Sequence, residues 1–330
     1  MKRLRKVAVI TGGNSGIGLS VCERLLTLHN NLELCLLCRN KHRAEAAKNA
    51  LLVSHPQSSI TIVIMDTSDV KSVFKAAQDL RQRYEGIDYL YLNAGIMPVT
   101  GVNWTNVVKG VLSSNCAHVL STGEGCLYHT DETTKDGLKN IFASNLFGHY
   151  TLIKELEDRL GGEKDTQIIW TSSRAAMKSA FNITDIQHKN GENPYSSSKY
   201  LIDTVSVSLN NKLNKKRVYS HTTCPGLVMS NLTNGVLPYW IWSIIYPLLI
   251  MLRLFCPSLT CSSFIGSEAM VWLSTQSPQS LDPQDKFNSD VDIFGKTHVS
   301  IVKLDIDTKT EETVCSKLDE LYKEFKTKYY

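Results

Sequence analysis

A glycine-rich turn near the start of the chain sets the strongest limit on its fold. The turn, residues 11–18 (Thr-Gly-Gly-Asn-Ser-Gly-Ile-Gly), follows a β-branched run at 7–10 and precedes a segment with apolar residues at helical spacing. Gly12 lets the chain turn sharply, Gly16 lets a pyrophosphate approach the backbone, and Gly18 lets the helix pack closely on the sheet. Because the N-terminus of a helix offers free N–H groups to phosphate, this strand, turn and helix predict a dinucleotide-binding site.

Strand-like and helix-like patterns alternate through the first half of the chain. We expect strands at 7–10, 32–38, 60–65 and 87–92, and helices at 17–28, 44–52 and 70–84. This alternation predicts right-handed βαβ units. The predicted fold class is therefore α/β: a Rossmann-type doubly wound parallel sheet with helices on both faces, plus an apolar substrate flap and a C-terminal helical extension.

The length of 330 residues allows two domains, but the pattern is that of one. We predict a single domain whose core at 1–225 binds the cofactor and carries the catalytic residues. An apolar flap at 226–267 would contact substrate or membrane, and 268–330 would form the C-terminal extension. The charges are dispersed and their balance is small, 36 − 32 = +4, so nucleic acid is not an expected partner.

The residues after the second and third expected strands predict how the adenosine half of the cofactor binds. An acidic residue after the second strand favours NAD, whereas an Arg pairs with the 2′-phosphate of NADP. The chain has Arg39 and Asn40 there and no acidic residue before Glu45, which favours NADPH; the alternative is a solvated basic loop. After the third strand, Asp66 either contacts the adenine or caps a helix beginning near Ser68.

Tyr195 and Lys199 form the strongest candidate for acid–base chemistry. They are spaced i and i+4, so on a helix they share one face. A nearby ammonium favours the phenolate and lowers the pKa of a tyrosine. The pair is therefore expected to act as a general acid or base near neutral pH.

Four further motifs accompany this pair, three at the ends of expected strands and one within an expected helix. Each has an ordinary alternative as a cap, a turn or a core polar group, but their joint occurrence in this order argues against coincidence. They are Asn93-Ala94-Gly95, Asn145, Ser172-Ser173 and Pro225-Gly226.

Together these motifs resemble those of the short-chain dehydrogenase/reductase family, and the resemblance covers nearly the whole chain. It implies that Tyr195 donates a proton to a carbonyl oxygen, and that Lys199 lowers the pKa of Tyr195 and holds the nicotinamide ribose. It also implies that Ser173 orients the carbonyl and that Asn145 anchors a water in the proton relay. The choice of Ser173 over Ser172 follows the register of the family.

The resemblance also implies an NADPH/NADP site. Its expected residues are Thr11, Gly12, Asn14, Ser15, Gly16, Ile17, Gly18, Arg39, Asn40, Asp66, Asn93, Ala94, Gly95, Tyr195, Lys199, Pro225 and Gly226. We expect no metal at the C-x-x-C pair Cys35 and Cys38, because residues i and i+3 of a strand point to opposite faces.

Two segments are longer than in many members of the family. One lies at 174–194, between Ser173 and Tyr195, and the other includes 101–128. Neither changes a catalytic identity. Both put in doubt any substrate pocket copied from a shorter relative.

Four strings are similar to those of the steroid-ketone reductases of this family: YLNAGIMP at 91–98, IWTSSR at 169–174, PYSSSKY at 194–200 and EAMVWL at 268–273. This resemblance implies NADPH-dependent reduction of a steroid ketone, the 3-keto group of a sterol intermediate in C4 demethylation of cholesterol biosynthesis, with estrone as a second substrate and C4-demethylation proteins as partners. Two alternatives stay open. One is a retinal or other lipid carbonyl reductase; the other is a non-catalytic cofactor-binding scaffold, against which the intact tetrad argues.

An uncharged window follows the expected core. Residues 218–252 contain no Asp, Glu, Lys or Arg, and the most apolar part, 236–256, includes Trp240 and Trp242. A run of this length can span a bilayer, although Pro247 interrupts a helix. We expect a flap that lies over the pocket and dips into the membrane interface; a single span and a buried helix pair are the alternatives.

These features predict a protein of the endoplasmic-reticulum membrane whose catalytic domain faces the cytosol. The odd number of nine cysteines indicates reduced thiols. Lys326 and Lys328 resemble a di-lysine retrieval signal, or they stabilise the C-terminus of an amphipathic last helix at 314–325. Relatives often pair through the helix that carries Tyr195, so a homodimer is also expected.

Overall fold

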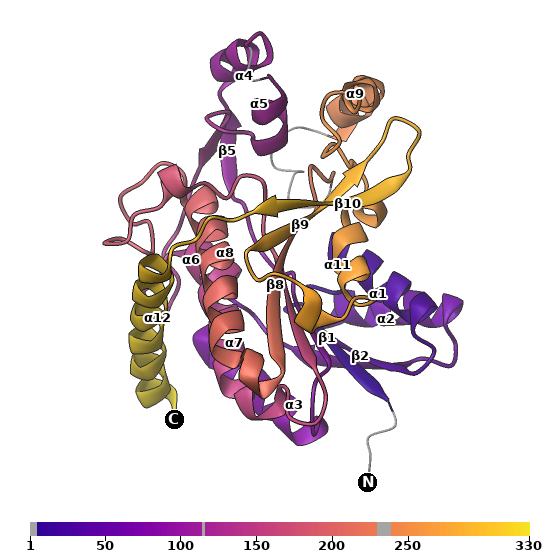
Figure 1. The fold of residues 1–330 in the computed structure, drawn as a ribbon, viewed down its shortest axis with the longest axis vertical. Helices are drawn as coiled ribbons and strands as arrows, with labels where there is room; N and C mark the ends of the chain where they lie inside the picture. The colour runs from indigo at the N-terminus through magenta and orange to yellow at the C-terminus, as the bar shows by residue number, and fades with distance from the viewer. Residues whose placement is uncertain (1–4, 114–115, 230–238) are drawn as a thin grey trace.

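An eight-stranded sheet organises this computed structural model, which describes residues 5–113, 116–229 and 239–330. The strand order is β10-β9-β8-β7-β4-β1-β2-β3. The pairs from β3 to β9 are parallel, and β10 joins β9 antiparallel at one edge. Helices cover both faces of the sheet (Figure 1). The predicted α/β fold class is confirmed, with an antiparallel edge strand that was not predicted.

The strands of this sheet are β1 (Lys6–Thr11), β2 (Leu32–Cys38), β3 (Ser59–Ile64), β4 (Tyr89–Leu92), β7 (Thr166–Thr171), β8 (Val218–Cys224), β9 (Asp285–Val291) and β10 (Thr297–Lys303). The principal helices are α1 (Gly16–Leu28), α2 (Lys41–Ser54), α3 (Val70–Arg83), α7 (Gly148–Leu156), α8 (Pro194–Leu213), α9 (Tyr239–Leu252), α11 (Glu268–Leu273) and α12 (Thr308–Tyr329). The helix expected at 44–52 begins earlier because the Asn40 side chain accepts a hydrogen bond from the Arg43 N–H at 3.0 Å and caps it.

Alternate residues of each strand enter two hydrophobic layers. Val9 of β1 packs in the layer formed with α3, α7, α8 and α12, whereas Ile10 packs in the layer formed with α1, α2 and α11. Cys35 and Cys38 of β2 lie in opposite layers, as strand alternation predicts. All nine cysteines lie in described parts of the chain, and no disulfide joins any of them.

The insertion that includes 101–128 builds an excursion on the carboxyl side of β4. It contains β5 (Val99–Val102), α4 (Trp104–Val111), α5 (Cys116–Thr122) and β6 (Leu127–His129), with β5 and β6 paired antiparallel. Figure 1 shows α4 and α5 at the end of the molecule opposite both termini. The insertion therefore lies at the carboxyl ends of the parallel strands, where the predicted catalytic residues also lie.

The C-terminal extension completes the sheet. β9 pairs in parallel with β8, with Thr223 opposite Phe287, so the chain returns beside β8 after the uncharged window. α12 packs against α7, where the Lys326 ammonium lies 2.9 Å from the buried carboxylate of Glu155. Lys326, one of the two lysines of the expected retrieval signal, therefore forms an ion pair that joins α12 to α7.

The helix that carries Tyr195 is almost completely buried within one chain. Residues 196–210 of α8 are all buried, because β8, α12 and the segment at 140–147 pack around them. The chain's own elements therefore cover most of α8, and the expected homodimer paired through this helix stays a prediction.

Part of the uncharged window forms α9. Leu249 of this helix is buried in a small apolar cluster with Cys256 and Leu259. Residues 230–238, and the side chains of Trp240 and Trp242, lie outside the described part of the chain. Among the described residues, no helix combines the length and the apolar character that crossing a bilayer would require.

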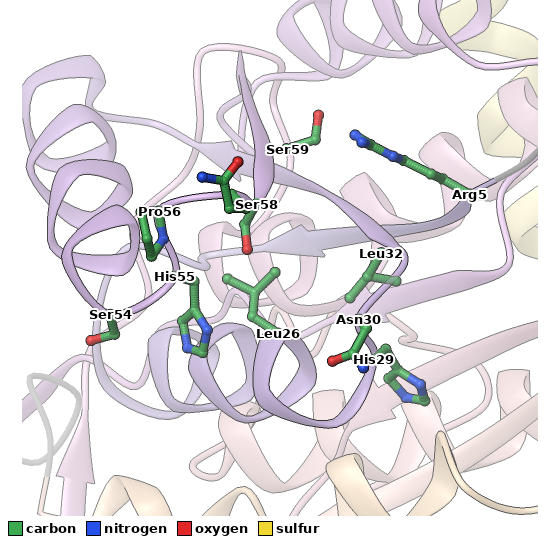
Figure 2. A pocket seen from close by; sticks show the side chains of 11 residues that line it. Arg5, Leu26, His29, Asn30, Leu32, Ser54, His55, Pro56, Ser58 and Ser59 are labelled. Carbon is green, nitrogen blue, oxygen red and sulfur yellow. The ribbon is translucent and has the colours of Figure 1, made fainter.

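A cavity of about 290 Å³ lies at the amino ends of the strands (Figure 2). Arg5, His29, Leu32, His55 and Ser59 are among the residues that line it. Because parallel strands place all their carboxyl ends at the opposite edge, this cavity is remote from the predicted catalytic motifs.

Candidate active site

The glycine-rich turn is tied to the segment that follows β4. Thr11 ends β1, and its buried hydroxyl accepts hydrogen bonds from the backbone N–H groups of Asn93 and Ala94, both at 2.9 Å. The Asn93 side chain donates to the Thr11 carbonyl at 3.1 Å. The Thr11 side chain therefore braces the turn from inside the protein, although we predicted that it contacts the cofactor.

Three predicted positions in this turn require glycine. A Cβ atom at Gly18 would lie 2.4 Å from the Gly12 carbonyl oxygen and 2.6 Å from Asn93 Nδ2. Gly12 and Gly16 have φ angles of +67° and +53°, a region that favours glycine. The turn thus has the close packing and the backbone path that the sequence predicts.

The N-terminus of α1 has no side-chain cap. Ser15 occupies the N-cap position, but its side chain makes no capping hydrogen bond, and the first turn holds no acidic residue. At α2 and α3, by contrast, Asn40 and Asp69 accept capping hydrogen bonds. The N–H groups of α1, flanked by the partly exposed Asn14 and Ile17, are therefore suited to bind phosphate.

Arg39 and Asp66 lie side by side after β2 and β3. The Arg39 side chain is 74% exposed, with Nη1 3.8 Å from Asp66 Oδ2. Asp66 Oδ1 accepts hydrogen bonds from the Ser68 N–H at 3.0 Å and hydroxyl at 2.7 Å. Because Asp69 caps α3, the helix-cap interpretation of Asp66 is wrong. Asn40 uses its side chain to cap α2, and the largely exposed Arg39 keeps its place as the candidate cation for a 2′-phosphate.

Tyr195 and Lys199 lie one turn apart on α8, as predicted. The Lys199 Nζ is 5.5 Å from the centre of the Tyr195 ring and donates to the Thr171 carbonyl at 2.7 Å. A Cβ at Gly95 would lie 3.0 Å from Asn145 Oδ1 and 3.9 Å from Lys199 Nζ. The structure therefore brings together the motifs that follow β4 and β7 and the pair on α8.

The pKa values of this pair differ from the prediction. Burial raises the pKa of Tyr195, and the hydrogen bond with the Ser173 side chain opposes this shift. Burial also lowers the pKa of Lys199, to about 8. We predicted that Lys199 lowers the pKa of Tyr195. In this structure desolvation of both groups dominates, so the tyrosine holds its proton more firmly than expected.

The two candidate serines occupy different environments. Ser173 is partly exposed, and its hydroxyl hydrogen bonds with Tyr195 and accepts from the Ala175 N–H at 3.1 Å. Ser172 is 1% exposed and directs its hydroxyl to the Lys199 carbonyl at 3.5 Å. The geometry therefore places Ser173, rather than Ser172, beside the candidate acid.

Asn145 lies in a π-helical turn, Ala143–Phe147, just before α7; such turns are frequent at functional sites. Its Oδ1 accepts from the Ile96 N–H at 2.8 Å, and its Nδ2 donates to the Ile96 carbonyl at 3.1 Å and to Ser198 Oγ at 3.2 Å. The amide therefore holds the segment after β4 against α8. The predicted role of Asn145 in anchoring a water stays a prediction.

The loop after β8 is clamped to the segment that follows α9. The Pro225 carbonyl accepts a hydrogen bond from Thr260 Oγ1 at 2.9 Å. Gly226 has a φ of +72°, and a Cβ there would lie 2.3 Å from the Ser258 carbonyl oxygen. Pro225 and Gly226 were predicted to contact the cofactor. In the structure they hold the loop after β8 against the segment at 258–260.

Two histidines of the site were not predicted from the sequence. His149 is fully buried, and burial lowers its pKa to about 4. The imidazole is therefore neutral near pH 7. The only signal in the sequence was its position four residues after Asn145, because the contact it makes with Thr11 spans most of the N-terminal half of the chain.

The second missed histidine, His129, comes from the insertion. Its ring stacks on that of Tyr195, with centroids 6.3 Å apart and an interplanar angle of 17°. Burial lowers the pKa of His129. A neutral imidazole ring therefore packs beside the candidate acid. The sequence carried no signal for this contact, since β6 and α8 meet only in the folded chain.

The residues present fit a nicotinamide dinucleotide. The three glycines leave space that a Cβ would fill, and α1 presents N–H groups without a side-chain cap. The turn at 12–18 would hold the pyrophosphate, Arg39 and Asp66 the adenosine end, and Lys199 the nicotinamide ribose. Asn93, Ala94 and Gly95 would form the floor between them.

Comparisons with known proteins agree with this arrangement. The family model described as short chain dehydrogenase matches residues 6–238. The rat and human proteins named 3-keto-steroid reductase/17-beta-hydroxysteroid dehydrogenase 7 are each 46% identical, over 97% of this chain and 96% and 94% of theirs. A 3-keto-steroid reductase of Schizosaccharomyces pombe is 29% identical over 98% of both chains.

Solved structures share the fold. A protein from Mycobacterium paratuberculosis superposes with a TM-score of 0.64 and 20% identity, covering 96% of this chain and 93% of that one. A 3-ketoacyl-(acyl-carrier-protein) reductase from Brucella melitensis, complexed with NADH, gives a TM-score of 0.58 and 16% identity, covering 87% and 98%. At these identities the likeness concerns the fold alone.

Proposed function

The chain belongs to the short-chain dehydrogenase family, and from this premise we propose that it reduces the 3-keto group of a sterol with NADPH. The substrate class rests on one observation, the 46% identity over 97% of the chain to two proteins named 3-keto-steroid reductase. The site supports the chemistry, because Tyr195, Lys199 and Ser173 meet at the carboxyl edge of the sheet. A scaffold without catalysis would not need this arrangement.

The proton chemistry follows from the geometry. A bound nicotinamide supplies the hydride to the carbonyl carbon. Tyr195 and Ser173 donate hydrogen bonds to the carbonyl oxygen, which positions the ketone. Because burial raises the pKa of Tyr195, the phenol keeps its proton near neutral pH and serves as the acid that protonates this oxygen. The Lys199 ammonium, 5.5 Å from the ring centre, stabilises the phenolate that remains.

We place the protein at the cytosolic face of the endoplasmic-reticulum membrane. Ile244, Leu248 and Met251 are spaced along one face of α9 and are 67%, 55% and 73% exposed. The chain then returns to pair β9 with β8, which favours a segment that dips into the interface. Such contact would deliver a lipid-soluble ketone to the site without passage through water, and cysteines that form no disulfide in the described chain suit the cytosol.

A single competition experiment tests the substrate. NADPH oxidation is followed in detergent–phospholipid micelles with a 3-ketosterol, estrone and retinal offered separately and together. We expect turnover of the 3-ketosterol, with estrone as a weaker substrate. Turnover of retinal alone would favour the lipid carbonyl alternative.

Two tyrosine variants on the same helix test the mechanism. We expect Tyr195→Phe to lower kcat by about 10²–10⁴-fold, the usual contribution of a general acid. Tyr200→Phe is the matched control, because Tyr200 is a buried neighbour on α8 outside the site. Turnover that survives Tyr195→Phe would overturn the assigned acid.

A further inference from the structure

A buried ion pair lies directly behind the candidate catalytic residues. Asp203 Oδ2 is 2.5 Å from Lys286 Nζ, and the two side chains are only 2% and 8% exposed. Asp203 follows Lys199 by four residues on α8, so Tyr195, Lys199 and Asp203 occupy successive turns of one helix face. Lys286 comes from β9, in the C-terminal extension.

The same lysine reaches the loop that carries the candidate serine. Lys286 Nζ donates a hydrogen bond to the Ser173 carbonyl at 3.1 Å. Four residues further along β9, on the same strand face, Asp290 binds the next loop residue: its carboxylate oxygens lie 2.8 and 3.1 Å from Arg174 Nη2. One face of β9 therefore holds the 173–174 loop at two successive points.

Stability alone is a poor explanation for charges at this place. Burying an ion pair costs desolvation energy that its attraction often only balances, and apolar residues of similar volume frequently stabilise a fold as well. The pair at 203 and 286 differs from an ordinary buried pair in its surroundings, since it adjoins the ammonium of Lys199 and the backbone of Ser173.

We propose that Asp203 and Lys286 are positioning residues of the reductase, which together hold the Ser173 loop and set the charge environment of Lys199. The proposal rests on the proposed function for the roles of Ser173 and Lys199. It adds two residues, one of them from the C-terminal extension, to the groups on which the reaction depends.

The charged and titratable groups around Lys199 determine in which direction each substitution should move the pKa of Lys199. Asp203 and Tyr195 face it from α8, Cys224 from β8, Lys286 from β9 and His149 from α7. After burial, which lowers the pKa of Lys199, Asp203 and Cys224 raise it and Lys286 lowers it. Removing Asp203 or Lys286 should therefore move the Lys199 titration in opposite directions.

The experiment compares Asp203→Asn, Lys286→Met and the double variant in the full-length chain. Protein carrying ¹³C-labelled lysine side chains is titrated by NMR, and the Lys199 signal is assigned by its loss in Lys199→Arg. We expect the midpoint to fall by about one pH unit in Asp203→Asn and to rise by about one unit in Lys286→Met. In the double variant it should return toward the original value.

Turnover provides the second readout. The loss of kcat/KM at high pH should shift in the same direction as the NMR midpoint in each variant. Lys303→Met is the matched control, because Lys303 also pairs with an aspartate, Asp282 at 2.7 Å, but lies 64% exposed on β10. It should leave both readouts unchanged.

The outcomes separate a positioning role from a merely structural one. Midpoints that do not move, or that move in the same direction in both single variants, would overturn the proposal. If one single variant does not fold, the other carries the test: the midpoint should fall in Asp203→Asn or rise in Lys286→Met, and an unmoved midpoint would overturn the proposal. Failure of every ketone to react would count against the proposed function, while the NMR midpoints would still decide this inference.

Discussion

Thr11 Oγ1 lies 3.0 Å from Nε2 of His149, which joins the start of the glycine-rich turn to the helix that follows Asn145. The other ring nitrogen, Nδ1, is 3.2 Å from the Asn145 carbonyl oxygen. Because that carbonyl can only accept, Nδ1 carries the proton, and Thr11 therefore donates to Nε2. One neutral imidazole thus links the cofactor turn to the π-helical turn of the site.

This link predicts an acid-sensitive fold. The pKa of His149 is about 4 in the folded chain against an ordinary value of 6.5. Between these values the unfolded chain binds a proton that the folded chain does not, so the free energy of unfolding falls as the pH drops from 6.5 to 4. The full loss is about 3 kcal/mol. Urea unfolding at a series of pH values measures it.

The matched variants for this prediction are His149→Gln and His42→Gln. Glutamine does not titrate, so His149→Gln should flatten the pH dependence in this window, leaving the part due to other groups with shifted pKa values, such as His221, whose pKa burial also lowers to about 4. His42 is exposed, and its replacement should leave the curve unchanged. Equal slopes for the original protein and His149→Gln would contradict the prediction.

Gly18→Ala should weaken cofactor binding. The added Cβ would lie 2.4 Å from a backbone oxygen of Gly12, so the turn must open. We expect the affinity for NADPH to fall about tenfold or more, roughly 1.4 kcal/mol, as measured by nicotinamide fluorescence. Gly101→Ala is the control, since its Cβ would meet no atom closer than 3.7 Å. Unchanged affinity in Gly18→Ala would show that the turn does not hold the pyrophosphate.

Arg39→Ser should reduce the preference for NADPH over NADH. A charge-assisted hydrogen bond contributes about 1.5–3 kcal/mol, so we expect the ratio of the two affinities to fall by about 10–100-fold. Arg43→Ser, which removes an exposed arginine from the first turn of α2, should have little effect. A ratio that stays constant in Arg39→Ser would reject Arg39 as the residue that reads the 2′-phosphate.

The exposed face of α9 should determine membrane binding. We expect Ile244→Ser combined with Met251→Ser to lower co-flotation with phosphatidylcholine–phosphatidylethanolamine vesicles by about fivefold or more, because each side chain would lose apolar burial in lipid. The control is Leu28→Ser with Val53→Ser, which removes two side chains that are also exposed, at 52% and 85%, on α1 and α2. Equal losses in both pairs would argue against α9 as the contact.

Short-range patterns determined much of this protein. The strand β2 has the predicted bounds, because a continuous apolar or β-branched run between breakers is a local property. The glycine turn and the spacing of Tyr195 and Lys199 are local too. These local patterns were therefore sufficient to predict the fold class, the family and the position of the candidate acid.

Tertiary structure decided what surrounds that acid. Lys286 meets Asp203, His129 stacks on Tyr195, and α12 covers part of α8, and in each case the partners are far apart in the chain. Desolvation depends on all the elements packed around a group, so the direction of the Tyr195 pKa was not readable from its neighbour at i+4 alone. The sequence determined which groups can react, and the packing of distant segments determined their protonation and their support.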